Sequence, residues 1–458
     1  MNQIEKIKKE LSPSKDYIFG KLLVKGKKIH YIYNEVLTNT ENINKLVLQS
    51  LLKIKSPKNL ENKLPNKTKI IKEEEIVNHL NNGYLILIQD KIYALEEKAS
   101  LDRGITKIES ELSLNGPKDS FNETYNNNLG LIRKRIKSKD LKVKELEIGK
   151  YTKNKTGILY IGTIVKKDLV NHVLKNLEKI NIDGIIDSSY LKESLENHFN
   201  VFPTIIATER PDKATMALLE GKVVILVDNS PYALILPSLL MDFFHTTDDY
   251  YQKPINTTII RIIRLIAFLI AIFTPAIYIS ITTRNYNLVP TSLLIMLKAG
   301  RTNVPFPAYI EALFMIVCFE ILKESDIRMS TTTGSSISIL GGLILGDAAV
   351  AAGIVSPIMI IVIAISSIAG LIFSSVELGN ALRFYKILLL FLGTLFGIYG
   401  ILIGAIILMR NIQTTEIFGY SYLAIDQNEI KDSILKISSK IKKRNSSLTN
   451  NIIRGRYK

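Results

Sequence analysis

Three acidic residues lie inside strongly apolar stretches of the second half of the chain: Glu311, Glu320 and Asp347. A carboxylate that faces lipid at the bilayer centre costs about 2.5–3.5 kcal/mol, so such residues normally face a helix bundle or a water path. Glu311 and Glu320 are nine residues apart, which places them about half a turn out of phase on one straight helix. They cannot both line one narrow pore, and Asp347, on a segment of small residues, is the better single candidate for an ion path. The alternative for each acid is a hydrogen-bonding role between packed helices.

A second group of charged residues comprises Glu209, Arg210, Pro211 and Asp212, before the first apolar stretch. Pro211 restricts the preceding residue to an extended conformation, and the flanking charges can pair with one another. The pattern favours a fixed loop over a ligand site. Because the loop is close in sequence to the predicted membrane entry, we hypothesise a coupling role, in which Arg210→Ala abolishes signalling without loss of assembled protein.

The elements that must position these acids are five strongly apolar blocks: residues 262–283, 305–322, 337–355, 358–376 and 384–409. A helix needs about 20 apolar residues to span the hydrocarbon core, and the blocks approach or exceed this length. They predict an α-helical polytopic membrane domain over residues 255–410. The spacing GxxxG, which brings helix backbones into contact, occurs three times, at Gly342/Gly346, Gly393/Gly397 and Gly400/Gly404. We therefore expect tightly packed helices and an oligomer.

The number of blocks conflicts with the distribution of charge. Five spans would place the basic tail, residues 411–458, on the opposite face from the N-terminal half, although both segments carry the lysines and arginines typical of cytosolic segments. Either one block is doubled or re-entrant, or the charge rule fails. Block 337–355, rich in glycine and alanine, is our candidate for an irregular segment.

The polar first half alternates predicted strands and helices, and the order strand, helix, hairpin occurs twice. Turn residues separate two pairs of apolar runs, one around Gln89 to Lys91 and one at residues 228–231. Each hairpin follows a helix that ends in glycine, at Gly83 and Gly221. The pattern predicts two related α/β subdomains, 16–110 and 111–250, preceded by a mobile leader over residues 1–15.

Composition excludes several classes of function. The formal charge is +16, but lysines are spread along the chain and do not cluster with aromatic residues, which argues against a nucleic-acid partner. The single cysteine, Cys318, can form neither an intrachain disulfide nor a cysteine metal site, and the five histidines lack ligand spacing. Since no nucleotide-binding or catalytic motif is present, we expect neither a cofactor nor enzyme activity. The charged start has no apolar signal segment, so we expect the first half on the cytosolic side.

Four stretches resemble, in order, the spore germination receptor A-subunit family (the GerA family): residues 180–191, 208–237, 304–328 and 341–357. The most specific is 208–237, which begins TERPD and continues through LLEG into a hairpin. Two departures from the family pattern bear on ion selectivity: the turn at residues 116–121 carries Lys118 and Asp119, and Ile316 stands where a second acid is frequent.

The resemblance implies a subunit of a nutrient-sensing complex in the inner membrane of the dormant spore. By this resemblance the chain forms a homo-oligomer, contacts membrane lipids and has two partner proteins, a B-type nutrient-binding membrane subunit and a C-type lipoprotein. The expected activity is a cation-release channel that nutrient opens. Three other functions remain open: a secondary transporter in which the acids relay protons, a scaffold subunit of the same complex, and a paralogue acting in later small-molecule release.

Overall fold

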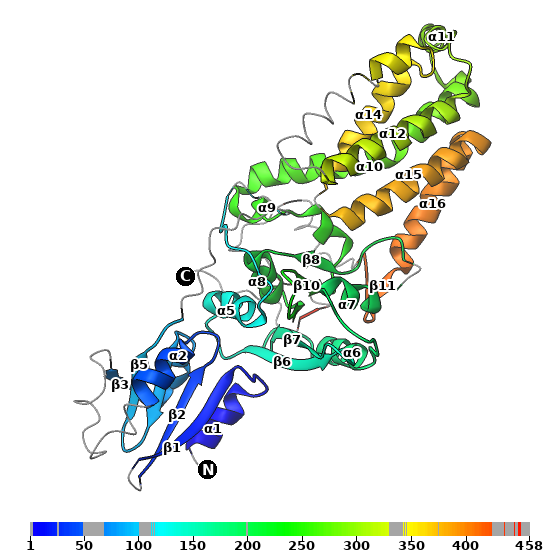
Figure 1. The fold of residues 1–458 in the computed structure, drawn as a ribbon. Coiled ribbons are helices and arrows are strands. Elements are labelled where there is room, and N and C mark those ends of the chain that lie inside the picture. The colour runs from blue at the N-terminus through cyan, green and yellow to red at the C-terminus, as the bar shows by residue number, and fades with distance from the viewer. Residues whose placement is uncertain are drawn as a thin grey trace.

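The α/β half and the helical half are distinct along the chain, and the helices extend away from one end of the α/β half (Figure 1). The computed structural model describes residues 3–24, 27–48, 68–99, 111–197 except 112 and 114, 200–328, 342–373 except 343 and 345, 375–423, and the single residues 435, 444, 448 and 449.

The first sheet has five strands in the order β1-β2-β4-β5-β3, and all neighbours are antiparallel. Its strands are β1 (Tyr17–Val24), β2 (Lys27–Asn34), β3 (Thr68–Ile70), β4 (Tyr84–Ile88) and β5 (Ile92–Glu96). The helical segments are α1 (Gln3–Leu11), α2 (Thr40–Asn42), a π-helical turn (Ile43–Leu48), a 3-10 turn (Glu73–Glu75) and α4 (Ile76–Leu80). The predicted hairpin is confirmed as β4 and β5.

The second sheet repeats this strand order as β6-β7-β9-β10-β8, again antiparallel throughout. Its strands are β6 (Leu141–Ile148), β7 (Asn154–Ile161), β8 (Ile206–Thr208), β9 (Val223–Val227) and β10 (Ala233–Leu236). Its helices are α5 (Tyr125–Arg135), α6 (Lys167–Glu178), α7 (Ser188–Leu195) and α8 (Pro211–Leu219). The second predicted hairpin is β9 and β10, whose residues are all buried because both faces of the sheet are covered. The repeated order of strands, helices and hairpin is therefore present in the structure.

The N-terminal segment differs from the predicted mobile leader. Residues 3–11 form α1, and Ile7 and Leu11 are buried against the first sheet with Ile4 packed beside them. These three residues recur at helical spacing on one face, which is the pattern of an amphipathic helix. The prediction of a mobile leader is wrong for the described residues from 3 onward.

The helical half comprises α10 (Pro254–Thr283), α11 (Thr291–Ala299), α12 (Ala308–Arg328), α14 (Pro357–Leu371), α15 (Val376–Phe396) and α16 (Ile398–Thr414). Among the described helices, α10 and α15 are long and apolar enough to cross a membrane, and α14 and α16 are shorter apolar helices. Large apolar side chains on these helices, such as Phe391, Leu402 and Ile406, are more than half exposed. The prediction of five membrane spans stays a prediction.

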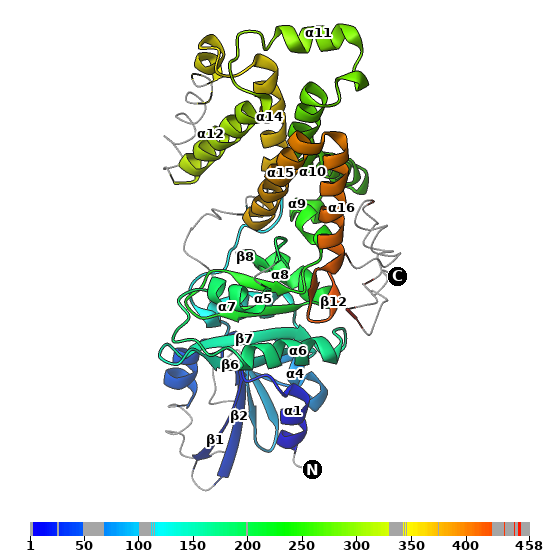
Figure 2. The same cartoon turned by 90° about the vertical axis from the view of Figure 1, so that its right-hand side faces the viewer.

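The last apolar block, 384–409, is not one helix. Gly397 ends α15 with φ +61° and ψ −138°, a conformation accessible essentially to glycine alone, and α16 begins at the next residue. The amide of Ile398 donates to Oδ1 of Asn285 (2.9 Å), which a side chain at Gly397 would strike. α15 and α16 pack side by side as a helical hairpin (Figure 2). Block 384–409 therefore contains parts of two helices. Our candidate for an irregular segment, block 337–355, lies outside the described residues up to position 341, and its described residues include a helical stretch around Asp347.

The glycines of the three GxxxG pairs have different surroundings. Gly400 lies against the backbone of Leu392 and Gly404 against the side chain of Leu389, so both bring α16 close to α15. A side chain at Gly393 would meet the carbonyl of Ala276 on α10 at 3.2 Å. Gly397 lies in the turn between α15 and α16 and does not bring two helices into contact. A side chain at Gly342 would meet only Leu322, at 3.8 Å, and at Gly346 none of the described residues lies within 4 Å.

The described part of the tail returns to the second sheet. Ile417 and Leu448 are buried in one of its hydrophobic clusters, and Thr449 pairs with Val165 in an antiparallel bridge. Because α15 and α16 form a hairpin, the first residues of α15 and the last residues of α16 both lie beside the α/β half.

Candidate functional site

The candidate site is the junction where the second sheet meets the first residues of α10 and α15. Arg210 begins it. This residue is the N-cap of α8, in an extended conformation (φ −97°, ψ 116°), and Pro211 occupies the first helical position. Proline favours both features, because its fixed φ suits the first turn and it excludes helical geometry for the residue before it. The extended conformation predicted for Arg210 is confirmed.

Arg210 has no solvent exposure, and its guanidinium makes four hydrogen bonds. It forms a bidentate ion pair with Asp212 (Nε to Oδ1 3.0 Å, Nη2 to Oδ2 2.8 Å) and donates to the carbonyls of Glu111 (3.2 Å) and Pro117 (3.1 Å). The neighbouring Glu209 accepts from the amide of Glu111 (3.0 Å). The predicted local pairing of charges is present, and this geometry fits a fixed loop.

Tyr251 connects this loop to the helical half. Its hydroxyl donates to Asp212 (2.7 Å), and it lies in α9 (Asp248–Tyr251), three residues before α10 begins. Burial raises the pKa of Asp212, but hydrogen bonds from Arg210 and Tyr251 outweigh this effect and the net pKa lies below its ordinary value. Gly116, at φ +110°, lies against the Tyr251 ring where a side chain would collide. The TERPD loop and the turn at residues 116–121 are therefore both packed on α9.

Asp249 continues the connection into α10. Its carboxylate accepts from Arg264 (2.7 Å) and Arg261 (3.4 Å), and all three side chains are at least nine-tenths buried. Burial raises the pKa of Asp249, and its hydrogen bond and attraction to Arg264 then bring the net pKa below the ordinary value. α10 starts at Pro254, and both arginines, in its first three turns, direct their side chains onto Asp249.

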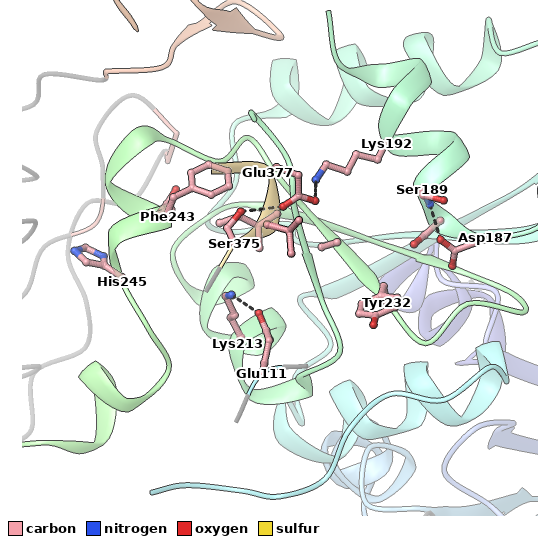
Figure 3. A pocket seen from close by; sticks show the side chains of 15 residues that line it. Glu111, Asp187, Ser189, Lys192, Lys213, Tyr232, Phe243, His245, Ser375 and Glu377 are labelled. Carbon is pink, nitrogen blue, oxygen red and sulfur yellow. Dashed lines mark hydrogen bonds and ion pairs between the residues drawn. The ribbon is translucent and has the colours of Figure 1, made fainter. Parts of the chain in front are cut away.

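A pocket of about 330 Å³ separates the second sheet from the start of α15 (Figure 3). Lys192 on α7 and Glu377 on α15 point toward one another across it and form an ion pair (2.6 Å). Ser375 caps α15 and donates to the same carboxylate (2.8 Å). On the opposite wall Lys213 pairs with Glu111 (2.7 Å). The pocket thus contains a direct charged link between the second sheet and α15.

The three candidate ion-path acids have separate surroundings. Glu311 is buried, and it accepts from Arg301 (2.8 Å) and from the amide of Ser356 at the start of α14 (3.0 Å). Glu320 on α12 pairs with Arg383 on α15 (2.7 Å). The side chain of Asp347 is exposed. The structure brings no two of these acids to a shared partner, and their role in conduction stays a prediction.

Sequence reasoning missed Asp249, Lys192 and Tyr251, since each meets its partner only through the fold. One signal was available: Arg261 and Arg264 are three residues apart and share one helix face, which calls for an acidic partner in an apolar helix. Among the described residues no group of three or more His, Cys, Asp or Glu side chains could hold a metal ion.

Comparison with known proteins gives consistent matches. The family described as "Bacillus/Clostridium GerA spore germination protein" matches residues 5–447. Spore germination protein KA of Bacillus subtilis (strain 168) is 32% identical over 455 residues, which cover 95% of this chain and 84% of that protein. The protein named "Uncharacterized membrane protein YfkQ", from the same organism, is 34% identical, with 77% and 71% covered.

Among solved structures, the chain is similar to the N-terminal domain of the A subunit of the Bacillus megaterium spore germinant receptor GerK3. It is 24% identical, covers 52% of this chain and 94% of that chain, and has a TM-score of 0.39. A TM-score this low does not establish a shared fold, so the relationship rests on the sequence matches.

Proposed function

Because the chain belongs to the GerA family of Bacillus/Clostridium spore germination proteins, we propose that it is the A subunit of a nutrient germinant receptor in the spore inner membrane. In this proposal the chain oligomerises and forms a cation-release channel that opens when nutrient binds. Its partners are a B-type nutrient-binding membrane subunit and a C-type lipoprotein, and its α/β half is cytosolic. It has no enzymatic activity.

The junction is the observation that carries the proposal. Charged side chains join the second sheet to α10 through Asp212, Tyr251 and Asp249, and to α15 through Lys192 and Glu377. α10 and α15 are the two described helices long enough to cross a membrane. A displacement of the α/β half would therefore act on both helices, as gating requires.

Two features support a membrane location for the helical half. The exposed apolar side chains of α14, α15 and α16 form the kind of outer surface that lipid covers. A relative that matches 77% of this chain is named a membrane protein. The spore inner membrane is our proposal for the location, supported by relatives that are named spore germination proteins.

A scaffold subunit is the second candidate, and the ion pairs of Glu311 and Glu320 favour it. An acid paired with arginine at a helix contact stabilises packing and offers no free carboxylate to a passing cation. The chain reconstituted in liposomes together with its B-type and C-type subunits, with nutrient added, distinguishes the candidates. Passive potassium flux supports the channel, saturable flux driven by a proton gradient supports a transporter, and absence of flux supports the scaffold.

A charge swap tests the coupling. Lys192→Glu and Glu377→Lys each break the link to α15, and the double variant restores it with reversed polarity. Because the Glu377 side chain is 45% exposed and water can solvate its carboxylate, losing this pair should cost less than the loss of one partner of a fully buried pair and should leave the protein folded. Lys98→Glu, which breaks the exposed pair with Glu96 in the first sheet, is the matched control.

The measurement is nutrient-induced potassium release from spores, with the amount of receptor checked by immunoblot. We expect little release from either single variant, restored release from the double variant and normal release from the control. Normal release from both single variants at normal receptor level would show that this link does not transmit the signal.

A further inference from the structure

A small basic pocket lies among the apolar helices, lined by residues of α10, α12, α14 and α15, with a volume of about 80 Å³. Three cations line it, namely Lys323, Arg383 and Lys386, against one carboxylate, Glu320. Small residues such as Ser367, Gly370 and Gly379 leave it open. Cations in excess inside an apolar bundle indicate that an anion belongs there.

The cations of this basic pocket are incompletely satisfied. Lys386 is 7% exposed and makes no hydrogen bond or ion pair with another described residue. Arg383 pairs with Glu320 through Nη2 (2.7 Å), while its buried Nε has no hydrogen-bond partner among the described residues. Burying an unpaired charge is costly. An anionic group that accepts from Lys386 and Arg383 would remove this cost.

An apolar groove adjoins the basic pocket and shares Glu320 and Arg383 with it. The groove has a volume of about 590 Å³, runs between α12 and α15, and has Glu324 and Ser325 at its polar margin. Its apolar lining consists of Leu313, Ile316, Val317, Ile321 and Ile387. A cationic pocket continuous with an apolar groove complements a molecule with an anionic head and a hydrocarbon chain.

The position along α15 agrees with such a ligand. The helix begins at Val376, beside the α/β half, and Lys386 is ten residues further on, or about 15 Å along the axis. Lys386 is the last charged residue of α15 before the uncharged, apolar run of residues 387–396. It therefore marks the boundary between the polar and the apolar part of this helix, on the side of the α/β half.

We propose that the basic pocket binds the headgroup phosphate of an anionic phospholipid, with an acyl chain in the adjoining groove. Basic pockets between membrane helices are known sites for anionic headgroups. The proposal rests on the membrane location proposed above, and it concerns a lipid site that the channel proposal does not require.

The test measures lipid retained by the purified full-length chain with native mass spectrometry, using phosphatidylglycerol and phosphatidylcholine as probes. We expect preferential binding of phosphatidylglycerol, about tenfold weaker in Lys386→Met and in Lys323→Met because each loses one charge-assisted contact. Lys386→Arg should retain binding. Arg410→Met, which removes an exposed cation on α16, is the matched control and should bind like the wild type.

Several results would overturn the proposal. These are equal binding of the two lipids, unchanged binding in both Met variants, an equal loss in Arg410→Met, and binding of inorganic phosphate without any preference for phosphatidylglycerol. A loss of oligomer in the Met variants with unchanged lipid binding would assign the groove to a second copy instead. Resistance of the wild type to alkaline extraction from membranes tests the membrane location separately.

Discussion

Replacing Arg210 by methionine should destabilise the chain more than replacing Arg210 and Asp212 together. The guanidinium of Arg210 makes two hydrogen bonds to Asp212 and one to each of the carbonyls of Glu111 and Pro117. Methionine removes all of them and leaves the Asp212 carboxylate, 7% exposed, with the Tyr251 hydroxyl but without its counter-ion.

The magnitude follows from the burial. Removing one partner of a buried ion pair costs about 3–5 kcal/mol, whereas replacing both partners by neutral groups often costs little. For a unit of about 150–250 residues each kcal/mol lowers the melting temperature by roughly 2–4 °C, so Arg210→Met should lower it by roughly 6–20 °C. The double variant with Asp212→Leu should recover a substantial part of this loss. The earlier hypothesis that Arg210→Ala leaves assembled protein intact must therefore be revised toward a reduced amount of protein.

The assay is thermal unfolding of the purified full-length protein, followed by circular dichroism. Lys27→Met is the control, because it breaks an exposed pair with Asp90 (3.3 Å) and should cost at most about 1 kcal/mol. A melting temperature of Arg210→Met equal to that of the control would refute the reasoning that this loop is held by a buried charge pair.

Two further predictions concern pH and topology. The folded-state pKa of Asp249 lies below the ordinary value of 3.8, so its stabilising contribution is complete above that value and is lost as the pH falls through the lower folded pKa. Asp249→Asn should therefore lose less stability than the wild type when melts at about pH 5 and about pH 3 are compared; equal losses would contradict the ionic role of Asp249. On a Cys318→Ser background, an impermeant maleimide should label Tyr399→Cys and Leu435→Cys from opposite sides of the membrane, since both positions are exposed and the α15–α16 hairpin separates them. Labelling from the same side would show that the hairpin does not cross.

Local signals made the hairpins of both sheets predictable. Turn residues between two apolar runs, as at residues 228–231 between β9 and β10, need no partner from elsewhere in the chain to form a hairpin. The strand β6, LKVKELEI, was not among the elements predicted from the sequence. Only its pairing with β7 along all eight residues makes it part of the sheet.

The division of the last apolar block could not be predicted from hydropathy. The residues on both sides of Gly397 are equally apolar, and the break depends on its backbone conformation and on Asn285, which is more than one hundred residues earlier. The charge distribution left open a doubled block, a re-entrant block or a failure of the charge rule. It could not locate a break within a block, since charge reports the side of the membrane and not the position of a turn.

The candidate site was predictable to the extent that its pairing is local. Pro211 and the charges beside it predicted the Arg210–Asp212 pair, which spans two residues. Tyr251 and Asp249, which connect this loop to α10, come from a separate segment of the chain. Their contacts depend on the folded structure and could not be predicted from local sequence.

The two charged links of the junction differ in strength, and this difference indicates which helix moves. The link to α10, between Asp249 and Arg264, is almost fully buried on both sides, and breaking it by removal of one partner would cost about 3–5 kcal/mol. The link to α15, between the buried Lys192 and the half-exposed Glu377, should cost less to break, because water can solvate the Glu377 carboxylate once the pair is lost. A bound nutrient can shift the equilibrium between the closed and the open state only by as much as its affinities for the two states differ. An ion pair that costs little free energy to break therefore needs the smaller difference in affinity. In the proposed receptor α10 is therefore the fixed support, and α15, which packs against it at Gly393, is the helix that we expect to change position when the channel opens.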